Sequence, residues 1–188
     1  MQSTRISNAL RCLVIAPVAS VRVAVIGRNS MLSRSIVQNC VHAGASVISV
    51  TDSENTYYYD CEYNRVRKET INTFLEKKID VDVIMSSVND IGITDITRIR
   101  NAIPRSLRFA TLICPSIINE TKEYTATRKL YMHEFSKLHR HCNVWILPTP
   151  PLLENRNMTN AFSFCRTYDE VANECVRVSI GNCDSSKV

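Results

Sequence analysis

Residues 21–34, with the sequence VRVAVIGRNSMLSR, constrain the fold more than any other part of the chain. The first half of this stretch is an apolar run rich in β-branched residues, which is typical of a strand buried on both faces. Gly27 ends the run, and Ser33 can cap a helix in which apolar residues recur at helical spacing. The stretch therefore predicts a buried strand that leads directly into a helix.

The rest of the chain repeats this pattern of apolar run, polar turn and amphipathic helix. Further apolar runs occupy residues 46–51, 81–86, 109–114 and 144–147. Apolar residues at helical spacing predict helices near 36–42, 71–79, 96–103, 124–141 and 169–178. Strands that alternate with helices predict a parallel sheet covered by helices on both faces. We therefore expect an α/β protein, a three-layer α/β/α sandwich with a five-stranded parallel sheet.

A chain of 188 residues fits one domain with a single core. We place this domain at residues 21–180, after an irregular N-terminus or targeting segment at 1–20 and before a polar tail at 181–188. The first 20 residues combine features of a signal peptide and of a transit peptide, so cytoplasmic and secreted locations both stay open. No apolar run approaches 18 residues, and no membrane span is predicted.

The formal net charge of +5 permits a polyanionic partner without requiring one. A polar segment at 52–68 interleaves tyrosines with basic residues, among them Arg65, Arg67 and Lys68. Rings beside cations can hold single-stranded nucleic acid. Acidic residues dilute this charge, and a surface loop that partly covers the site is the other interpretation of the segment.

Eight cysteines are spread along the chain, and no two have the CxxC spacing of zinc ribbons or thioredoxin-type sites. Cys40 and Cys114 fall inside apolar patterns, so we expect buried thiols at these positions. The even number of cysteines would allow disulfides in an exported protein. The sequence predicts no metal site and no resident cofactor.

The predicted topology locates the candidate site, because ligands of such sheets bind beyond the carboxyl ends of the strands. The dinucleotide fingerprint G-x-G-x-x-G can be aligned with the sequence from Gly27 onward, with Asp52 as the acid after the second strand. Asn29 and Leu32 then replace the second and third glycines. A degenerate Rossmann-like nucleotide-binding domain is therefore one alternative for the function.

Three blocks of sequence resemble the SGNH/GDSL hydrolase family, whose fold is flavodoxin-like. The blocks are Gly27-Arg-Asn-Ser30, Ser87-Val-Asn89-Asp90 and Asp169-Glu-Val-Ala172. They follow the order and spacing of the family motifs G-D-S, G-x-N-D and D-x-x-H. The resemblance extends from about residue 21 to residue 173.

The resemblance implies roles for individual residues. Ser30 would be the nucleophile, Asn89 would stabilise the oxyanion, and Asp169 would orient the base. Further ligand contacts would come from Gly27, Asn29, Ser87 and Asp90. Ala172 stands where the family has its histidine, and a serine without a base is a poor nucleophile. The implied function is therefore binding of a small-molecule ester or protein partner by an incomplete triad, with a divergent serine ester hydrolase as the alternative.

Overall fold

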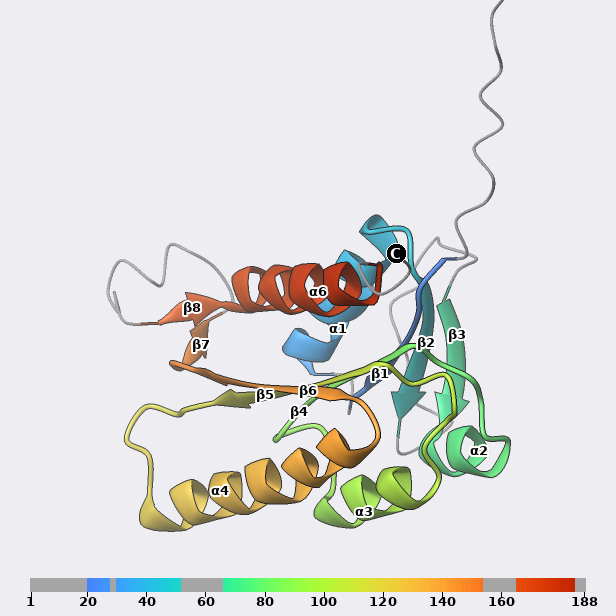
Figure 1. Cartoon of the computed structure of the whole chain (residues 1–188). Helices are drawn as coiled ribbons and strands as arrows, with labels where there is room; N and C mark the ends of the chain where they lie inside the picture. Colours follow the sequence, from blue (N-terminus) through green and yellow to red (C-terminus); the bar gives the residue numbers. More distant parts are fainter. Residues whose placement is uncertain (1–19, 28–29, 52–65, 154–164, 185–188) are drawn as a thin grey trace, which may run out of the picture.

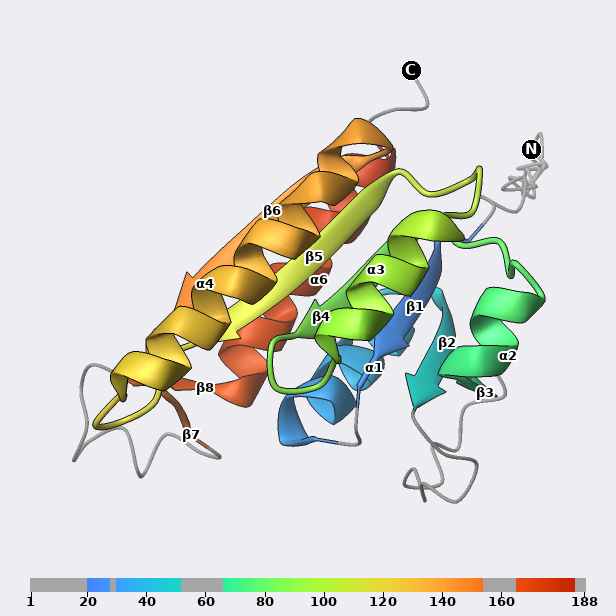
Figure 2. The same cartoon turned by 90° about the horizontal axis from the view of Figure 1, so that it is seen from below.

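The computed structural model describes residues 20–27, 30–51, 66–153 and 165–184, which form a parallel sheet between two layers of helices (Figures 1 and 2). The elements, in chain order, are β1 (Arg22–Ile26), α1 (Met31–His42), β2 (Ser46–Thr51), β3 (Val66–Thr70), α2 (Ile71–Glu76), β4 (Val83–Ser87), α3 (Ile93–Asn101), β5 (Phe109–Pro115), α4 (Lys122–Ser136), the 3₁₀ helix η1 (Lys137–Arg140), β6 (Asn143–Thr149), β7 (Leu152–Leu153), β8 (Arg166–Thr167) and α6 (Tyr168–Asp184). The predicted fold class, an α/β/α sandwich around a parallel sheet, is confirmed.

The main sheet has six strands in the order β3-β2-β1-β4-β5-β6, and every neighbouring pair is parallel. From β1 the chain builds outward to β3 on one side, returns to the centre, and builds outward through β4 to β6. The reversal between β1 and β4 is the topological switch point of a doubly wound sheet.

The prediction of five strands is wrong by one strand, because β3 was assigned to a polar loop. The sequence of β3 is VRKET, and its residues are exposed or only half-buried. An edge strand needs no apolar run, since charged residues on an edge protect the sheet from further pairing. Without β3, the remaining order would be the flavodoxin order; with β3, it is the order 3-2-1-4-5-6 of dinucleotide-binding folds.

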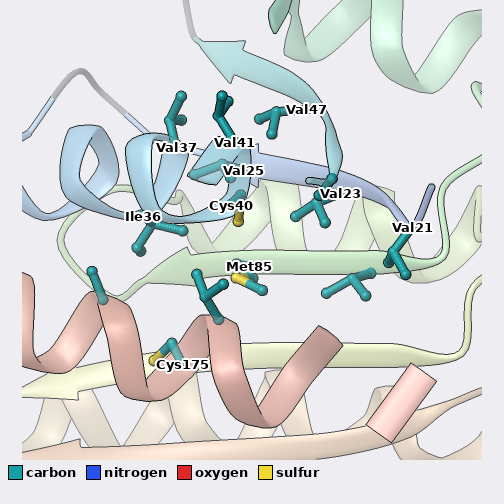
Figure 3. Packing of buried hydrophobic residues seen from close by; sticks show 14 of the residues in the cluster. Val21, Val23, Val25, Ile36, Val37, Cys40, Val41, Val47, Met85 and Cys175 are labelled. Atoms are coloured by element: carbon teal, nitrogen blue, oxygen red, sulfur yellow. The ribbon is translucent and has the colours of Figure 1, made fainter. Parts of the chain in front are cut away.

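Helices α1 and α6 cover one face of the sheet, and α2, α3 and α4 cover the other (Figures 1 and 2). On the first face, Val23 and Val25 of β1, Cys40 of α1 and Cys175 of α6 belong to one buried cluster (Figure 3). A second cluster fills the opposite face and includes the fully buried Phe135. The central strands are therefore apolar on both faces, which explains their unbroken apolar sequences.

Several helix boundaries differ from the prediction. The N-cap of α1 is Ser30, whose hydroxyl accepts a hydrogen bond from the Ser33 N–H at 3.1 Å, so Ser33 lies within the first turn of the helix and does not cap it. Gly44 follows α1 with a φ of +83°, as expected for the glycine that closes a helix. The last helix continues to Asp184, into the region assigned to the polar tail.

The buried thiols predicted from the sequence are present. Cys40 and Cys114 are 0% exposed, and burial raises the pKa of each thiol to about 12. Such thiols stay protonated and behave as small apolar side chains. Among the described residues, no helix could cross a membrane, and no three His, Cys, Asp or Glu side chains come together as metal ligands.

An ion pair at the amino ends of β1 and β4 makes the stability of the folded protein depend on pH in the acid range. The Asp82 carboxylate accepts hydrogen bonds from the Arg22 backbone N–H at 2.9 Å and from Arg22 Nε at 3.2 Å. Burial raises the pKa of Asp82, but these bonds and the charge of Arg22 lower it more, so the net shift is downward. The unfolded chain therefore binds more protons than the folded protein below the ordinary Asp pKa of about 3.9.

We expect this contribution to stability to be complete above about pH 4 and to be lost as the pH falls through the lowered pKa of Asp82. Urea unfolding of the wild type and of Asp82→Asn between pH 2 and pH 6 measures it. The variant should be less stable than the wild type at neutral pH and should approach it in acid. Asp80→Asn, at a nearby exposed carboxylate, is the control. Parallel pH profiles for wild type and Asp82→Asn would contradict the expectation.

Candidate functional site

A pocket of about 310 Å³ lies beyond the carboxyl ends of β1, β4 and β5, at the switch point of the sheet. This is the edge at which doubly wound sheets bind ligands. The residues that line the pocket come from the segments after these strands, from the start of α1, from β7 and its approach, and from the start of α6. They are Ser30, Met31, Leu32, Ser87, Asn89, Asp90, Pro115, Ser116, Ile117, Ile118, Pro151, Leu152 and Tyr168.

Close packing of β1 against α1 fixes one side of this site. A side-chain carbon at Gly27 would lie 2.5 Å from Ser33 Cβ and 2.8 Å from Ser33 Oγ, closer than atoms can approach. Only glycine therefore permits this contact between the end of the strand and the first turn of the helix. The Gly27 N–H also donates to the Val50 carbonyl at 2.9 Å, which ties the turn to β2.

Ser30 and Asp90 form a bonded polar pair in the pocket lining. The Ser30 hydroxyl donates to Asp90 Oδ2 at 2.7 Å and accepts from the Ser33 N–H at 3.1 Å. Asp90 is 3% exposed, so its carboxylate is nearly enclosed beside the N-terminus of α1. The positive end of the helix dipole stabilises a negative charge at this position. The hydroxyl of Ser30 is thus engaged in local bonds as both donor and acceptor.

Asn89 and Tyr124 connect the pocket to α4. The Tyr124 hydroxyl lies 2.9 Å from the Pro115 carbonyl and 3.3 Å from Asn89 Oδ1, and both oxygens can accept from it. Burial raises the pKa of the Tyr124 phenol, and the hydrogen bond to Asn89 offsets only part of this rise. The phenol is therefore a protonated donor that holds the Asn89 amide in place at neutral pH.

Much of the remaining pocket lining is apolar. Ile117 and Ile118 follow β5 and are 40% and 47% exposed, which is unusual for large apolar side chains in this structure. Leu152 and Tyr168 line the same pocket. A few polar groups in a largely apolar lining are usual features of a small-molecule pocket, in which the polar groups orient the ligand.

Four of the predicted site residues line the pocket. Ser30, Asn89, Ser87 and Asp90 all line the pocket, whereas Gly27 lies at the turn without lining it. Asp169 instead accepts a hydrogen bond from Ser35 on the second turn of α1 at 2.7 Å. Asn29 and Asp52 lie outside the described residues.

The chemistry expected of a serine hydrolase is missing at this pocket. Ser30 donates to a carboxylate rather than to an imidazole, and none of the lining residues is a histidine. Ala172, where the family has histidine, is 0% exposed within the α6 packing surface. A group at position 172 therefore faces the core.

The basic segment that suggested nucleic-acid binding is only partly described. Arg67 lies on the edge strand β3 and forms an ion pair with Glu69, and Lys68 lies between them. Arg65 lies outside the described residues. Pairing with Glu69 reduces the charge that Arg67 could offer to a phosphate, and binding of nucleic acid stays a prediction.

Sequence reasoning missed Tyr124 and Tyr168 as residues of the site. Both tyrosines sit in the first turn of a helix on the carboxyl side of the sheet, α4 for the first and α6 for the second. Their helices were predicted, with α4 beginning at residue 124 and α6 at residue 169. The available signal was the position itself, since the first turn of a helix that follows a parallel strand faces the ligand edge.

Three solved structures illustrate what this chain is similar to. Yeast methylglyoxal/isovaleraldehyde reductase Gre2, in complex with NADPH, matches 81% of this chain and 69% of its own, with 12% identity and a TM-score of 0.57. The UDP-N-acetylglucosamine 4-epimerase from Bacillus cereus matches 86% and 72%, with 14% identity and a TM-score of 0.61. The Bordetella bronchiseptica enzyme WbmH, in complex with NAD+, matches 86% and 73%, with 8% identity and a TM-score of 0.59.

The chain spans only part of these proteins, and it covers 57% of a further one, Gre2 from Candida albicans. No protein-family model matches the chain, and no curated protein matches it in sequence. The resemblance to SGNH/GDSL hydrolases is wrong, because the similar structures are a reductase, an epimerase and an enzyme solved with NAD+. The predictions that this chain is a hydrolase or a degenerate hydrolase are therefore wrong as well. Strand order and structural similarity together assign a Rossmann-like fold to this chain.

Proposed function

We propose that this chain is a Rossmann-like domain that binds a nucleoside-containing small molecule in the pocket at the switch point. The observation that carries the proposal is the coincidence of this pocket with the reversal of strand order between β1 and β4. Ligands of open α/β sheets bind in that crevice, outside the carboxyl ends of the strands. The degenerate nucleotide-binding alternative drawn from Gly27 is thus the better-supported one.

The structural neighbours support the nucleoside part of the proposal. Yeast Gre2 was solved with NADPH and WbmH with NAD+, and both ligands contain nucleosides. In this chain the N-terminus of α1 opens on the pocket through Ser30, Met31 and Leu32. Backbone N–H groups in the first turn of a helix have no partner within the helix and can donate to a ligand.

The residues present do not fit the pyrophosphate of NAD(P) at its usual position on the first helix. That position requires close backbone approach, which glycines of the fingerprint normally allow. Here Ser30 occupies the helix entry, and its hydroxyl is bonded to the enclosed carboxylate of Asp90. A volume of about 310 Å³ is also at the lower end of the range for ligand pockets. We therefore propose a ligand smaller than a dinucleotide.

Thermal unfolding with nucleosides, nucleotides and NAD(P) tests the proposal. We expect saturable stabilisation by at least one nucleoside-containing compound. A ligand at a hundred times its Kd stabilises the folded state by about 2.7 kcal/mol, which raises the Tm of a chain of this size by roughly 5–10 °C. Ser116→Phe, which fills the pocket, should abolish the shift.

Ala126→Phe is the matched control, because Ala126 lies on the exposed side of α4, away from the pocket. This variant should respond to the same compounds as the wild type. Stabilisation that survives in Ser116→Phe would place the ligand elsewhere on the protein. An unchanged Tm with every compound would reject a nucleoside-containing ligand.

A further inference from the structure

A second pocket lies at the opposite end of the sheet, at the amino ends of β5 and β6. Its volume of about 550 Å³ is in the usual range for small-molecule sites, and it shares no lining residue with the pocket at the switch point. The polar part of its lining comes from the approach to β5, from η1 and the turn after it, and from the last turn of α6. These polar residues are Arg108, His139, Arg140, His141, Asn143 and Asn182.

The charge of this lining has one sign. Arg108 and Arg140 carry permanent positive charges, and no Asp or Glu lines the pocket. The charge of Arg108 also acts on Asp82, but the carboxylate of Asp82 is bonded to Arg22. A concave surface lined by cations focuses their field and attracts anions.

Arg140 has no partner within the described part of the chain. It is exposed, and it forms no ion pair and no side-chain hydrogen bond there. Other arginines of the described residues pair with carboxylates, namely Arg22, Arg67, Arg98, Arg100, Arg128 and Arg166. A planar guanidinium can donate two parallel hydrogen bonds to a phosphate group, so the free side chain of Arg140 suits such a ligand.

The backbone that carries Arg140 is fixed on both sides. Leu138 of η1 is 0% exposed, and its carbonyl accepts from the His141 N–H at 2.9 Å. The Asn143 N–H donates to the Arg108 carbonyl at 2.9 Å, which ties the turn to the start of β5. Because this turn is already ordered, a ligand that binds there has less backbone freedom to remove.

We propose that this pocket is a second ligand site, which binds a small multivalent anion carrying phosphate groups, with Arg140 as its bidentate donor. Arg108 adds a second positive charge. The exposed side chains of His141 and Asn143 add neutral hydrogen-bond donors. The site is separate from the nucleoside pocket and does not depend on it.

Calorimetric titration with inorganic pyrophosphate, a probe without a nucleoside, tests the inference at a salt concentration of about 0.15 M. The wild type should bind pyrophosphate saturably with one site per chain. Arg140→Gln should weaken this binding by roughly tenfold to a hundredfold, the usual effect of losing hydrogen bonds from a charged group. Urea unfolding of the variant should match that of the wild type, since Arg140 is exposed.

Lys129→Gln is the matched control, because it removes the same charge from an exposed position earlier on α4, outside the pocket. It should bind pyrophosphate as the wild type does. Unchanged binding by Arg140→Gln would place the anion elsewhere and overturn the inference. An equal loss in Lys129→Gln would show general attraction to a basic surface, and would overturn it as well. A wild type that does not bind pyrophosphate saturably would overturn it without any variant, and would leave the nucleoside pocket untouched.

Discussion

Replacement of Gly27 by alanine is expected to destabilise the protein by about 1–3 kcal/mol, the usual cost of forcing a methyl group into a packed interior. The added Cβ would lie 2.5 Å from Ser33 Cβ, and Ser33 is fixed in the first turn of α1. Either β1 or α1 must shift to relieve the overlap. Because Ser30 and Asp90 are adjacent to this contact, the shift also disturbs the pocket. Urea unfolding and ligand binding measure the two effects.

Gly181→Ala is the internal control for this experiment. Gly181 lies in α6, and a methyl group added there would have no atom within 4 Å. The same substitution should therefore stabilise the protein by roughly 0.5–1 kcal/mol, since alanine is the better helix former. In addition, Ser33→Gly should partly rescue Gly27→Ala, because it removes the atoms that collide. Equal effects at positions 27 and 181 would contradict the close approach of β1 to α1.

The sequence contains enough information for the fold class because its central strands are buried on both faces. The sequence of β1, RVAVI, is apolar from its second residue onward, and all of those residues are buried. Such runs are easy to recognise and alternate with helices in regular order. In contrast, β3 depends on pairing with β2 through its backbone, with Val47 opposite Val66. Its side chains carry no periodic signal, and only the three-dimensional sheet identifies it as a strand.

The location of the site was predictable from topology, but its chemistry was not. Parallel strands bring Ser30, Ser87 and Asn89 to one edge of the sheet, whether or not these side chains have a role in function. Serine, asparagine and aspartate are also the residues that cap helices and form turns, so they recur after the strands of any such fold. The spacing of the three hydrolase-like blocks follows from that architecture. Spacing alone therefore could not distinguish a hydrolase from a Rossmann-like domain.

Hydrogen bonds decide between these interpretations. The serine of the hydrolase family donates to the histidine that takes its proton, whereas Ser30 donates to the carboxylate of Asp90 and caps α1. The third block fails for a different reason: Asp169 is bonded to Ser35, so its carboxylate faces α1 instead of the pocket. Neither contact is encoded in local sequence patterns, since one joins residues 60 apart and the other joins residues 134 apart.

Position 172, where the hydrolase family has its histidine, is the subject of the second prediction with a large expected effect on stability. We expect Ala172→His to destabilise the protein by about 3 kcal/mol or more. Ala172 is 0% exposed and belongs to the cluster of α1, α6 and the sheet. An imidazole there combines overpacking, at roughly 1–3 kcal/mol, with a buried polar group that lacks a partner, at a similar cost. The neighbouring Cys175 in Figure 3 marks the same packed surface.

Chemical denaturation at two pH values measures this effect. Burial disfavours the charged imidazole, so the loss should grow as the pH falls below the unfolded histidine pKa of about 6.5. Ala126→His, on the exposed side of α4, is the matched control and should change stability by less than about 1 kcal/mol, through helix propensity alone. A tolerated histidine at 172 would mean that this face of α6 is open, and the assignment of position 172 to the core would be wrong. A large loss confined to position 172 would explain physically why this chain cannot carry a hydrolase base there.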